Sequence, residues 1–289
     1  HLSLRRQRQM CIRDSYEIAQ SVGFKDIDFQ YEPIAAAFDY ESQIDKEELV
    51  LIADIGGGTS DFSLVRLSPE RAKKADRRDD ILATGGVHIG GTDFDKYLSL
   101  TSIMPLLGLG SRLNNDTEVP SSYYFNLATW HTINLAYSQK TWLQIKDIYR
   151  DARDKAKLDS LLHLIENRSG HWLALKAEEG KIALSSQTET ELLLDRLAPS
   201  TTLTLRRDEF DESIAKMVGA VENTVVNLLN DAGIAAEDVD TVVFTGGSSG
   251  VQLLREKISA LLPDARRVEG DLFGSIGAGL ALDAVRKFG

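Results

Sequence analysis

The chain has 289 residues, of which 43% are hydrophobic and 27% charged, enough for one large or two moderate domains. Its net charge of −11 argues against a general nucleic-acid binder, because contacts with phosphate backbones need clustered Lys and Arg side chains. No apolar run reaches the ~18 residues of a membrane helix, and the single cysteine, Cys11, cannot form an intrachain disulfide, so we expect a cytoplasmic protein with no membrane partner.

The start of the chain differs in composition from the remainder. Residues 1–15 are rich in arginine and show no helical or strand period, so we predict a non-native or artefactual arm, with a genuine basic arm as the alternative. Residues 16–22 then resemble the end of a helix that Gly23 stops. Residues 26–31 are predicted to form a short strand.

A Glu-Pro pair opens the next segment, which reads YEPIAAAFDYE over residues 31–41. Glu32 and Pro33 favour an extended entry, and the small residues after them favour a helix that can approach a neighbour closely. By itself this pattern predicts no more than an ordinary helix.

A strand, a glycine turn and a second strand come next, reading LVLIADIGGGTSDFSLVRL over residues 49–67. The apolar runs predict a buried hairpin, and the three glycines would let backbone N–H groups approach an anion closely. Asp54 and Asp61 flank the turn, and a carboxylate pair beside an anion suits a hydrated Mg²⁺. Taken alone, three glycines are also what a tight turn needs.

A second glycine pair precedes a predicted helix. Residues 81–84 predict a strand, the string GGVHIGGTDFD comes after it, and N-cap chemistry would start a helix near Thr92 or Asp93. Gly90 and Gly91 would then lie at a helix N-terminus, which suits an anion or a ribose.

The middle of the chain is rich in aromatic residues. We expect residues 99–172 to form mainly the core of an inserted subdomain, with a binding surface as the alternative. Apolar spacing predicts helix over residues 143–165. In the next helical stretch, Glu178 and Lys181 are three residues apart and so face one side, which a surface ion pair would also explain.

The last third predicts two strands, a long helix, and a further strand with a glycine turn. The strands cover residues 188–197 and 201–205, and Asp208 is predicted to cap the helix that Gly233 ends. A buried strand over residues 239–245 leads into GGSSG and another helix, an arrangement that suits ligand binding. Asp271 is predicted to cap a final glycine-containing helix.

Four of these segments resemble, in the same order, motifs of the actin-like ATPase superfamily. The DIGGGTSD turn resembles its second phosphate motif, EPIAAA its first connecting motif, GGSSG its adenosine motif and the final helix its second connecting motif. The strings HIGGTDFD and LKAEEGKIALSS are similar to the 70-kDa heat-shock (DnaK-like) chaperone family, especially its short YegD-like members. No Walker-type GxxxxGK[ST] loop occurs in the chain.

The resemblance implies an α/β fold, an actin-like ATPase (ribonuclease H-like) lobe with a mixed five-stranded sheet and helices, plus an α/β subdomain. Residues 49–94 and 201–289 would form the nucleotide-binding lobe, and residues 95–200 the inserted subdomain with its aromatic-rich insertion. Residues 16–48 would be a remnant of a first lobe, otherwise mostly missing, with the connecting helix.

The resemblance also implies a site for ATP or ADP with Mg²⁺. It assigns catalytic roles to Asp54, Asp61, Glu32 and Thr59, and assigns the metal, through water, to Asp54 and Asp61. In the family, residues matching Glu178 and Lys181 contact the ribose and one matching Ser185 lies near the adenine. The nucleotide-binding residues that it implies are Gly56, Gly57, Gly58, Gly90, Gly91, Glu178, Lys181, Ser185, Gly246, Gly247, Ser248 and Asp271.

Two departures from the family pattern bear on activity. The opening phosphate motif D-x-G-T-T/N and its lobe's catalytic Lys are absent, and Gly250 stands where the family has an Arg that stacks on the base. We therefore expect the chain to start within an ATPase domain and to bind and turn over ATP weakly by itself.

The function that the resemblance implies is an ATP-binding chaperone ATPase that switches conformation with its nucleotide. Its partners would be the nucleotide and a client polypeptide or co-chaperone. The alternative is an MreB-like or FtsA-like filament subunit, since MreB-type proteins share a GGGT hairpin and an EPxAAA segment. A sugar kinase would need a catalytic Asp in a sugar pocket, which we cannot place in this sequence.

Overall fold

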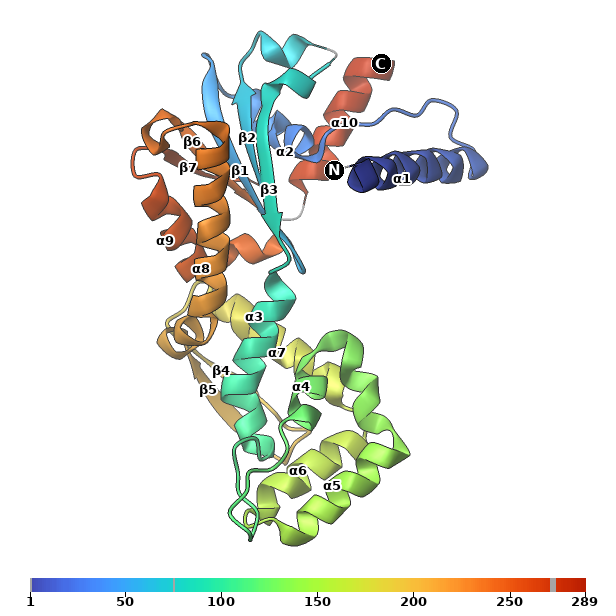
Figure 1. The fold of residues 1–289 in the computed structure, drawn as a ribbon, viewed down its shortest axis with the longest axis vertical. Coiled ribbons are helices and arrows are strands. Elements are labelled where there is room, and N and C mark those ends of the chain that lie inside the picture. The colour runs from blue at the N-terminus through green and yellow to red at the C-terminus, as the bar shows by residue number, and fades with distance from the viewer. Residues whose placement is uncertain (1, 75, 271–273) are drawn as a thin grey trace.

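The computed structural model describes residues 2–74, 76–270 and 274–289. The chain is elongated, with a sheet and its covering helices at one end and a helical subdomain at the other (Figure 1). None of the described helices combines the length and the apolar character that a membrane crossing requires.

Five strands form one mixed sheet in the order β3-β2-β1-β6-β7, as the resemblance implied. β1, β2 and β3 pair antiparallel, whereas β6 runs parallel to both β1 and β7. β1 and β6 therefore end at the same edge of the sheet, so the glycine turns after them meet there. The strands are β1 (Glu48–Ile55), β2 (Ser60–Leu67), β3 (Ile81–Val87), β6 (Thr241–Thr245) and β7 (Arg266–Glu269).

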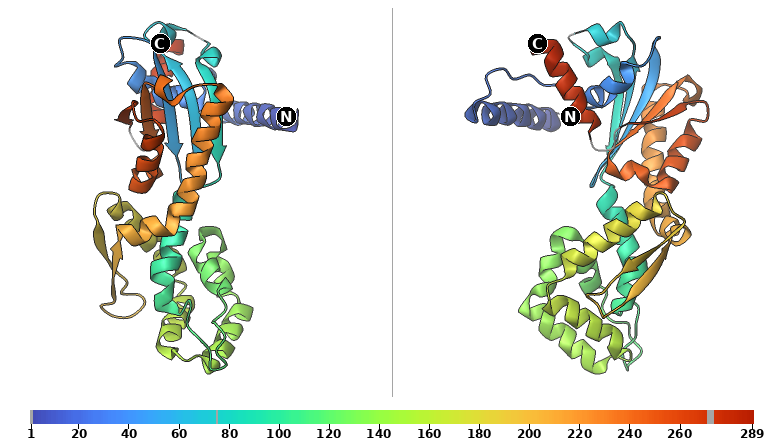
Figure 2. Two further views of the ribbon diagram at one scale, coloured as in Figure 1. Left: turned by 60° about the vertical axis from the view of Figure 1, so that its left-hand side comes forward. Right: turned by 180° about the vertical axis from the view of Figure 1, so that it is seen from behind.

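Helices cover both faces of this sheet (Figures 1 and 2). The sheet and these helices together are called the sheet lobe. Side chains alternate along each strand, so Leu51 enters the core under one pair of helices and Val50 enters the core under the other pair. Burial on both faces explains why β1 is apolar almost throughout. The first pair is α8 (Arg207–Ala232) and α9 (Gln252–Leu261), and the second is α2 (Glu32–Glu41) and α10 (Ser275–Phe288).

Two small residues let α2 and α10 cross closely. A Cβ atom added at Gly279 would overlap the carbonyl oxygen of Ala35, which is fully buried. Gly277, which precedes it on α10, has nothing within 4 Å of such an atom. The small-residue face predicted for residues 35–37 is therefore confirmed as a helix-packing face.

The helical subdomain continues from β3 through α3 and returns through the hairpin β4–β5 into α8 (Figure 1). Its core contains fully buried side chains from several helices, among them Ile103, Tyr124 and Leu161. The elements are α3 (Gly91–Leu98), a π-helical turn (Ser99–Ile103), a 3₁₀ turn (Met104–Leu107), α4 (Ser122–Ala128), a 3₁₀ segment (Trp130–Tyr137), α5 (Gln139–Asp151), α6 (Lys155–Glu166), α7 (Gly170–Leu184), β4 (Glu189–Leu193) and β5 (Thr202–Arg206).

The aromatic-rich segment contributes to both core and surface. Tyr124 is fully buried, whereas Phe125 and Trp130 are 44% and 51% exposed. The helix predicted over residues 143–165 is two helices, because the chain leaves helical geometry after α5. Asp154 then caps α6 by accepting a hydrogen bond from the Lys157 backbone N–H.

Two expectations for element boundaries are wrong, and one segment without a helical period in its sequence is nevertheless helical. Residues 2–15 are that segment, and they belong to α1 (Leu2–Ser21), which extends away from the sheet lobe in both views of Figure 2. Residues 26–31, predicted as a strand, are loop, held to α10 by a hydrogen bond from Gln30 to Asp283. Asp208 does not cap α8, because Arg206 occupies that position.

A buried ion cluster fixes the loop between β2 and β3. The Arg77 side chain is fully buried and pairs with Glu41 of α2 at 2.7 Å and with Asp80. Both carboxylates are only 1% exposed. Arg71 pairs with Asp80 as well, at 2.5 Å, so the loop is tied to the end of α2.

Candidate functional site

The β1–β2 turn forms one wall of the candidate site. The Gly56 N–H donates to the Thr59 carbonyl oxygen at 2.9 Å and closes the turn. A Cβ atom at Gly57 or Gly58 would meet nothing within 4 Å, and both residues are exposed. The absence of side chains at this tip therefore leaves the backbone open to a ligand rather than to a protein neighbour.

The start of α3 lies against this turn. The Gly91 and Thr92 N–H groups donate to the carbonyl oxygens of Gly56 and Gly57, at 3.0 and 2.7 Å. A Cβ atom at Gly90 would lie 2.6 Å from the Gly58 nitrogen, so only glycine allows this approach. The first amides of α3 thus already have protein acceptors, and Gly90 and Gly91 shape the site rather than offer free donors.

The glycine turn after β6 meets the β1–β2 turn, as one shared site for both turns would require. Gly246 has a φ of 81°, and a Cβ atom there would lie 2.6 Å from Asp54 Oδ1 and 2.5 Å from the Ile55 carbonyl oxygen. Ser248, in the 3₁₀ turn Gly247–Gly250, places its Oγ where a Cβ atom of Gly91 would be. Two turns that are far apart in the sequence and the start of α3 therefore share one location.

Three carboxylates gather at this edge. Asp54 lies near the end of β1, directly opposite Asp61 of β2. Burial, together with the neighbouring carboxylates of Glu32 and Asp61, raises the pKa of Asp54 to about 6. Asp61 is exposed and accepts a hydrogen bond from Thr59 Oγ1 at 2.7 Å. The concentrated negative charge suits a cation.

The described carboxylates at this edge do not by themselves form a metal site with three or more protein ligands. Among the described residues, no group of three or more His, Cys, Asp or Glu side chains is arranged to hold a metal ion. The donor set of Asp54 and Asp61 nevertheless fits a hydrated Mg²⁺, which keeps most of its waters and needs few protein ligands.

Lys181 of α7 is not free, although the resemblance assigned it to a ribose. Its side chain is 8% exposed, and its Nζ lies 2.8 Å from Asp95 Oδ1 and 3.0 Å from Asp95 Oδ2. Burial raises the pKa of Asp95 to about 6, with a contribution from Glu178 in the same direction and an opposing one from Lys181. Asp95 is therefore a residue that the sequence analysis missed. It stands in the quoted GGTDFD string, but no pattern in the sequence links it to Lys181.

The end of α7 docks on the turn after β6. A Cβ atom at Gly250 would lie 3.7 Å from Ser185 Cβ, and Gln252 Nε2 donates to the Ser185 carbonyl oxygen at 2.9 Å. The Ser185 hydroxyl donates within its own helix, to the Ile182 carbonyl oxygen at 2.6 Å. Gly247 is exposed at the turn. Asp271 lies outside the described residues.

The predicted site residues that the structure describes thus lie around one edge of the sheet, from the carboxylates of β1 and β2 to the end of α7. A ligand here would meet glycine backbone and negative charge. That arrangement suits a phosphate-bearing ligand with a hydrated cation at one end.

Comparisons with known proteins agree with the fold. A model of the family described as Hsp70 protein matches residues 6–103 and 147–281. A Chaperone protein HscA homolog of Shewanella baltica is 28% identical over 272 residues, covering 92% of this chain and 34% of that protein. The Chaperone protein dnaK of Cyanophora paradoxa is 29% identical over 238 residues, covering 80% of this chain and 29% of that protein. The Chaperone protein HscA of Pectobacterium atrosepticum is 29% identical over 255 residues, covering 87% of this chain and 31% of that protein.

The matches cover only part of the relatives and leave out one segment of this chain. The chain spans about a third of the length of the curated relatives that it matches. The family match also leaves out residues 104–146, which hold α4, the 3₁₀ segment and the start of α5. The filament alternative is not favoured by these matches. The sheet order, the converging glycine turns and a family match over most of the sequence lead to one conclusion: the chain belongs to the Hsp70 family.

Proposed function

We propose that this chain supplies one side of an ATP or ADP site with Mg²⁺ in a chaperone ATPase. The observation that carries the proposal is the meeting of two glycine turns at Asp54, where Gly246 lies against Asp54 and Ile55. A nucleotide needs a phosphate cradle and an adenosine cradle within its own length, and these turns stand next to each other.

In this proposal the turn Gly56–Thr59 receives the phosphates. Asp54 and Asp61 bind the Mg²⁺ through water, and Glu32 faces the same water shell. Burial is the main cause of the raised pKa of Asp54, and Glu32 and Asp61 add to it, so a cation bound beside these carboxylates would favour the charged form of Asp54. When bound, Mg²⁺ would neutralise phosphate charge during transfer to water.

The adenosine would lie between the turn Gly246–Ser248 and the end of α7, where Ser185 stands beside Gly250. Glu178 is exposed and available to a ribose, whereas Lys181 would have to share its ammonium with Asp95. Gly250 supplies no cation to stack on the base, so we expect weaker adenine binding than an arginine at this position would give.

The wider activity is part of the same proposal. The relatives are named chaperones, and we infer that nucleotide-dependent closure acts on a client polypeptide or a co-chaperone in this protein too. A cytoplasmic location fits the single cysteine. Because the chain contains no D-x-G-T-T/N motif, we expect it to bind nucleotide weakly and to hydrolyse ATP slowly by itself.

The test is ADP binding to this chain by calorimetry with Mg²⁺, in wild type and in Gly57→Val. The valine side chain would start in open space and would fill the proposed phosphate position, so we expect at least about tenfold weaker binding with unchanged thermal stability. Gly219→Val, at a glycine of α8 that is equally open, should leave binding unchanged. Equal affinity in wild type and Gly57→Val, or no binding at millimolar ADP, would refute the proposed site.

A further inference from the structure

β7 forms one edge of the five-stranded sheet, and no other strand of the described chain pairs with its outer side. The backbone N–H groups of Arg266 and Gly270 donate to carbonyl oxygens on the β6 side, at 2.9 and 3.0 Å. Because alternate residues of a parallel strand face the same neighbour, the backbone N–H and C=O groups of Arg267 and Glu269 point away from β6. This edge therefore presents two residues whose donors and acceptors can pair with a further strand.

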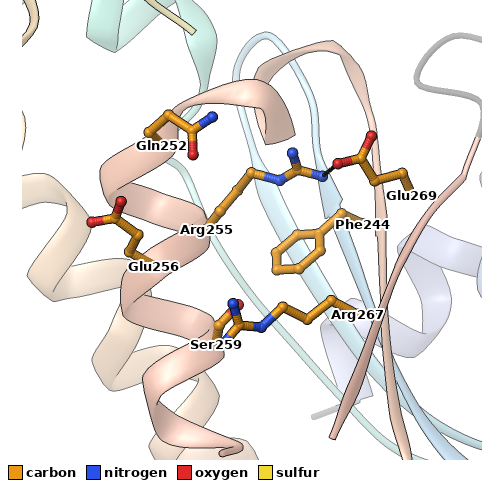
Figure 3. A pocket seen from close by; sticks show the side chains of 7 residues that line it. All are labelled: Phe244, Gln252, Arg255, Glu256, Ser259, Arg267 and Glu269. Carbon is orange, nitrogen blue, oxygen red and sulfur yellow. Dashed lines mark ion pairs between the residues drawn. The ribbon is translucent and has the colours of Figure 1, made fainter. Parts of the chain in front are cut away.

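The side chains of this edge alternate between the two faces of the sheet. Val268 packs against the core on the α2 side, whereas Arg267 and Glu269 lie on the α9 side, where they line a cavity of about 220 Å³ (Figure 3). Glu269 is 71% exposed and pairs through its Oε1 atom with Arg255 at 2.8 Å. Arg267 is exposed and makes no ion pair or side-chain hydrogen bond with any described residue. Two opposite charges thus stand two residues apart along an open edge.

We propose that β7 pairs antiparallel with β7 of a second copy of this chain, around a two-fold axis at Val268. In this register Arg267 of each copy lies opposite Glu269 of the other, and these residues exchange N–H to C=O hydrogen bonds. Arg267 gains a carboxylate. Glu269 keeps Arg255 at Oε1 and offers Oε2 to the second copy. The two five-stranded sheets then join into one continuous sheet.

The charge pattern selects this register over its neighbours. An antiparallel pair places outward-facing residues opposite each other, so the two-fold axis has alternative positions at Arg267 and at Glu269. The first puts Arg267 opposite its own copy and the second does the same for Glu269, and like charges directly opposite each other are unfavourable. Charged side chains on a short edge strand generally prevent pairing with unrelated strands, whereas this pattern is complementary to itself.

Sedimentation equilibrium of the whole chain without nucleotide tests the proposal. Because β7 has only four residues, the interface is small, and we expect a reversible dimer with a dissociation constant of about 100 µM. Amide hydrogen exchange well below and well above this concentration locates the contact. The Arg267 and Glu269 amides should exchange several-fold more slowly in the concentrated sample. The Arg266 amide, which already has an acceptor within the chain, should not change.

Charge-reversal variants separate this edge from other surfaces. Arg267→Glu and Glu269→Arg each place like charges opposite each other in their own dimers, so each should self-associate at least tenfold more weakly than wild type. An equimolar mixture of the two variants should form a mixed dimer with about the wild-type affinity, since opposite charges then face each other. Arg78→Glu, the same charge change at an exposed residue before β3 on the other edge of the sheet, should leave dimerisation unchanged.

Three results would overturn the proposal. The first is a chain that stays monomeric at millimolar concentration. The second is a dimer that neither charge reversal weakens, because its contact would then lie on another surface. The third is a mixture of the two variants that associates no better than either variant by itself. All these measurements are made without nucleotide, so their outcome is independent of ADP binding.

Discussion

Asp54 carries its charge in surroundings that oppose it. Its pKa is raised from 3.8 to about 6, so the folded chain binds this proton more tightly than the unfolded chain. The resulting stabilisation is fully present below about pH 4 and is lost as the pH rises through about 6. At neutral pH, the carboxylate therefore destabilises the chain unless a cation is bound beside it.

Asp54→Asn removes this titration while it keeps the shape of the side chain. At pH 8 without Mg²⁺ we expect the variant to melt about 1–3 °C above wild type, a small gain because Asp54 is partly solvated. The difference should vanish near pH 4, where the wild-type carboxyl is protonated. Thermal unfolding followed by circular dichroism across this pH range provides the measurement. A variant less stable than wild type at pH 8 would contradict the electrostatic account.

Lys181 and Asp95 depend on each other because both are buried from most solvent. Lys181→Met or Asp95→Asn alone leaves one group without its counter-charge and should cost about 3 kcal/mol of unfolding free energy. The double variant should cost clearly less than the two single variants added together. Chemical denaturation of all four proteins measures this coupling. Additive losses would show that the pair contributes no mutual stabilisation.

At the scale of elements, the crossing of α2 and α10 rests on one glycine. Gly279→Ala would force its methyl group against the Ala35 carbonyl oxygen, so the helices must separate, at a cost of about 2 kcal/mol or more. Gly277→Ala is the matched control on the same helix. Its methyl group meets nothing within 4 Å, so better helix propensity should stabilise the chain by up to about 1 kcal/mol. Equal denaturation midpoints for the two variants would show that the contact is not tight.

The loop between β2 and β3 is held by a buried ion cluster. Arg77→Met removes the only cation that both Glu41 and Asp80 contact within the described part of the chain, and we expect a loss of about 3–5 kcal/mol. The neighbouring Arg78→Met breaks an exposed pair with Asp76, each side chain 72% exposed, and should change stability by at most about 0.5 kcal/mol. Urea denaturation compares the two, and a small effect of Arg77→Met would mean that water replaces the arginine.

At the scale of the whole molecule, the sheet was predictable and the helical parts less so. The hairpin around Gly56–Gly58 was predictable because a glycine turn between two apolar runs leaves few alternatives. The pairing of β1 with β6 was accessible only through the family resemblance, since no local pattern joins strands so far apart. In the part of α1 whose side chains are described, residues 12–21, almost all side chains are exposed, so this helix shows no amphipathic pattern by which the sequence could have predicted it.

The candidate site, too, could be predicted from the sequence only in part. Its turns and carboxylates were located from the sequence because the strings that hold them resemble family motifs, whereas three glycines alone would also suit a tight turn. The pairing of Lys181 with Asp95 was not found, because it joins two helices that are adjacent only after the subdomain has folded. The occupied amides at Gly91 and Thr92 were missed for a related reason, since their acceptors lie in the turn after β1.

The parallel pairing of β1 with β6 also has a consequence for synthesis on the ribosome. Leu49 and Asp240, which hydrogen-bond beside these strands, are 191 residues apart. Until β6 emerges, a nascent chain therefore carries β1 with one unpaired edge and the first glycine turn without its neighbour. Such an edge can pair with another chain. The interval between translation of β1 and β6 is thus a period in which the nascent chain is exposed to aggregation, and in which the proposed nucleotide site would still lack its second glycine turn.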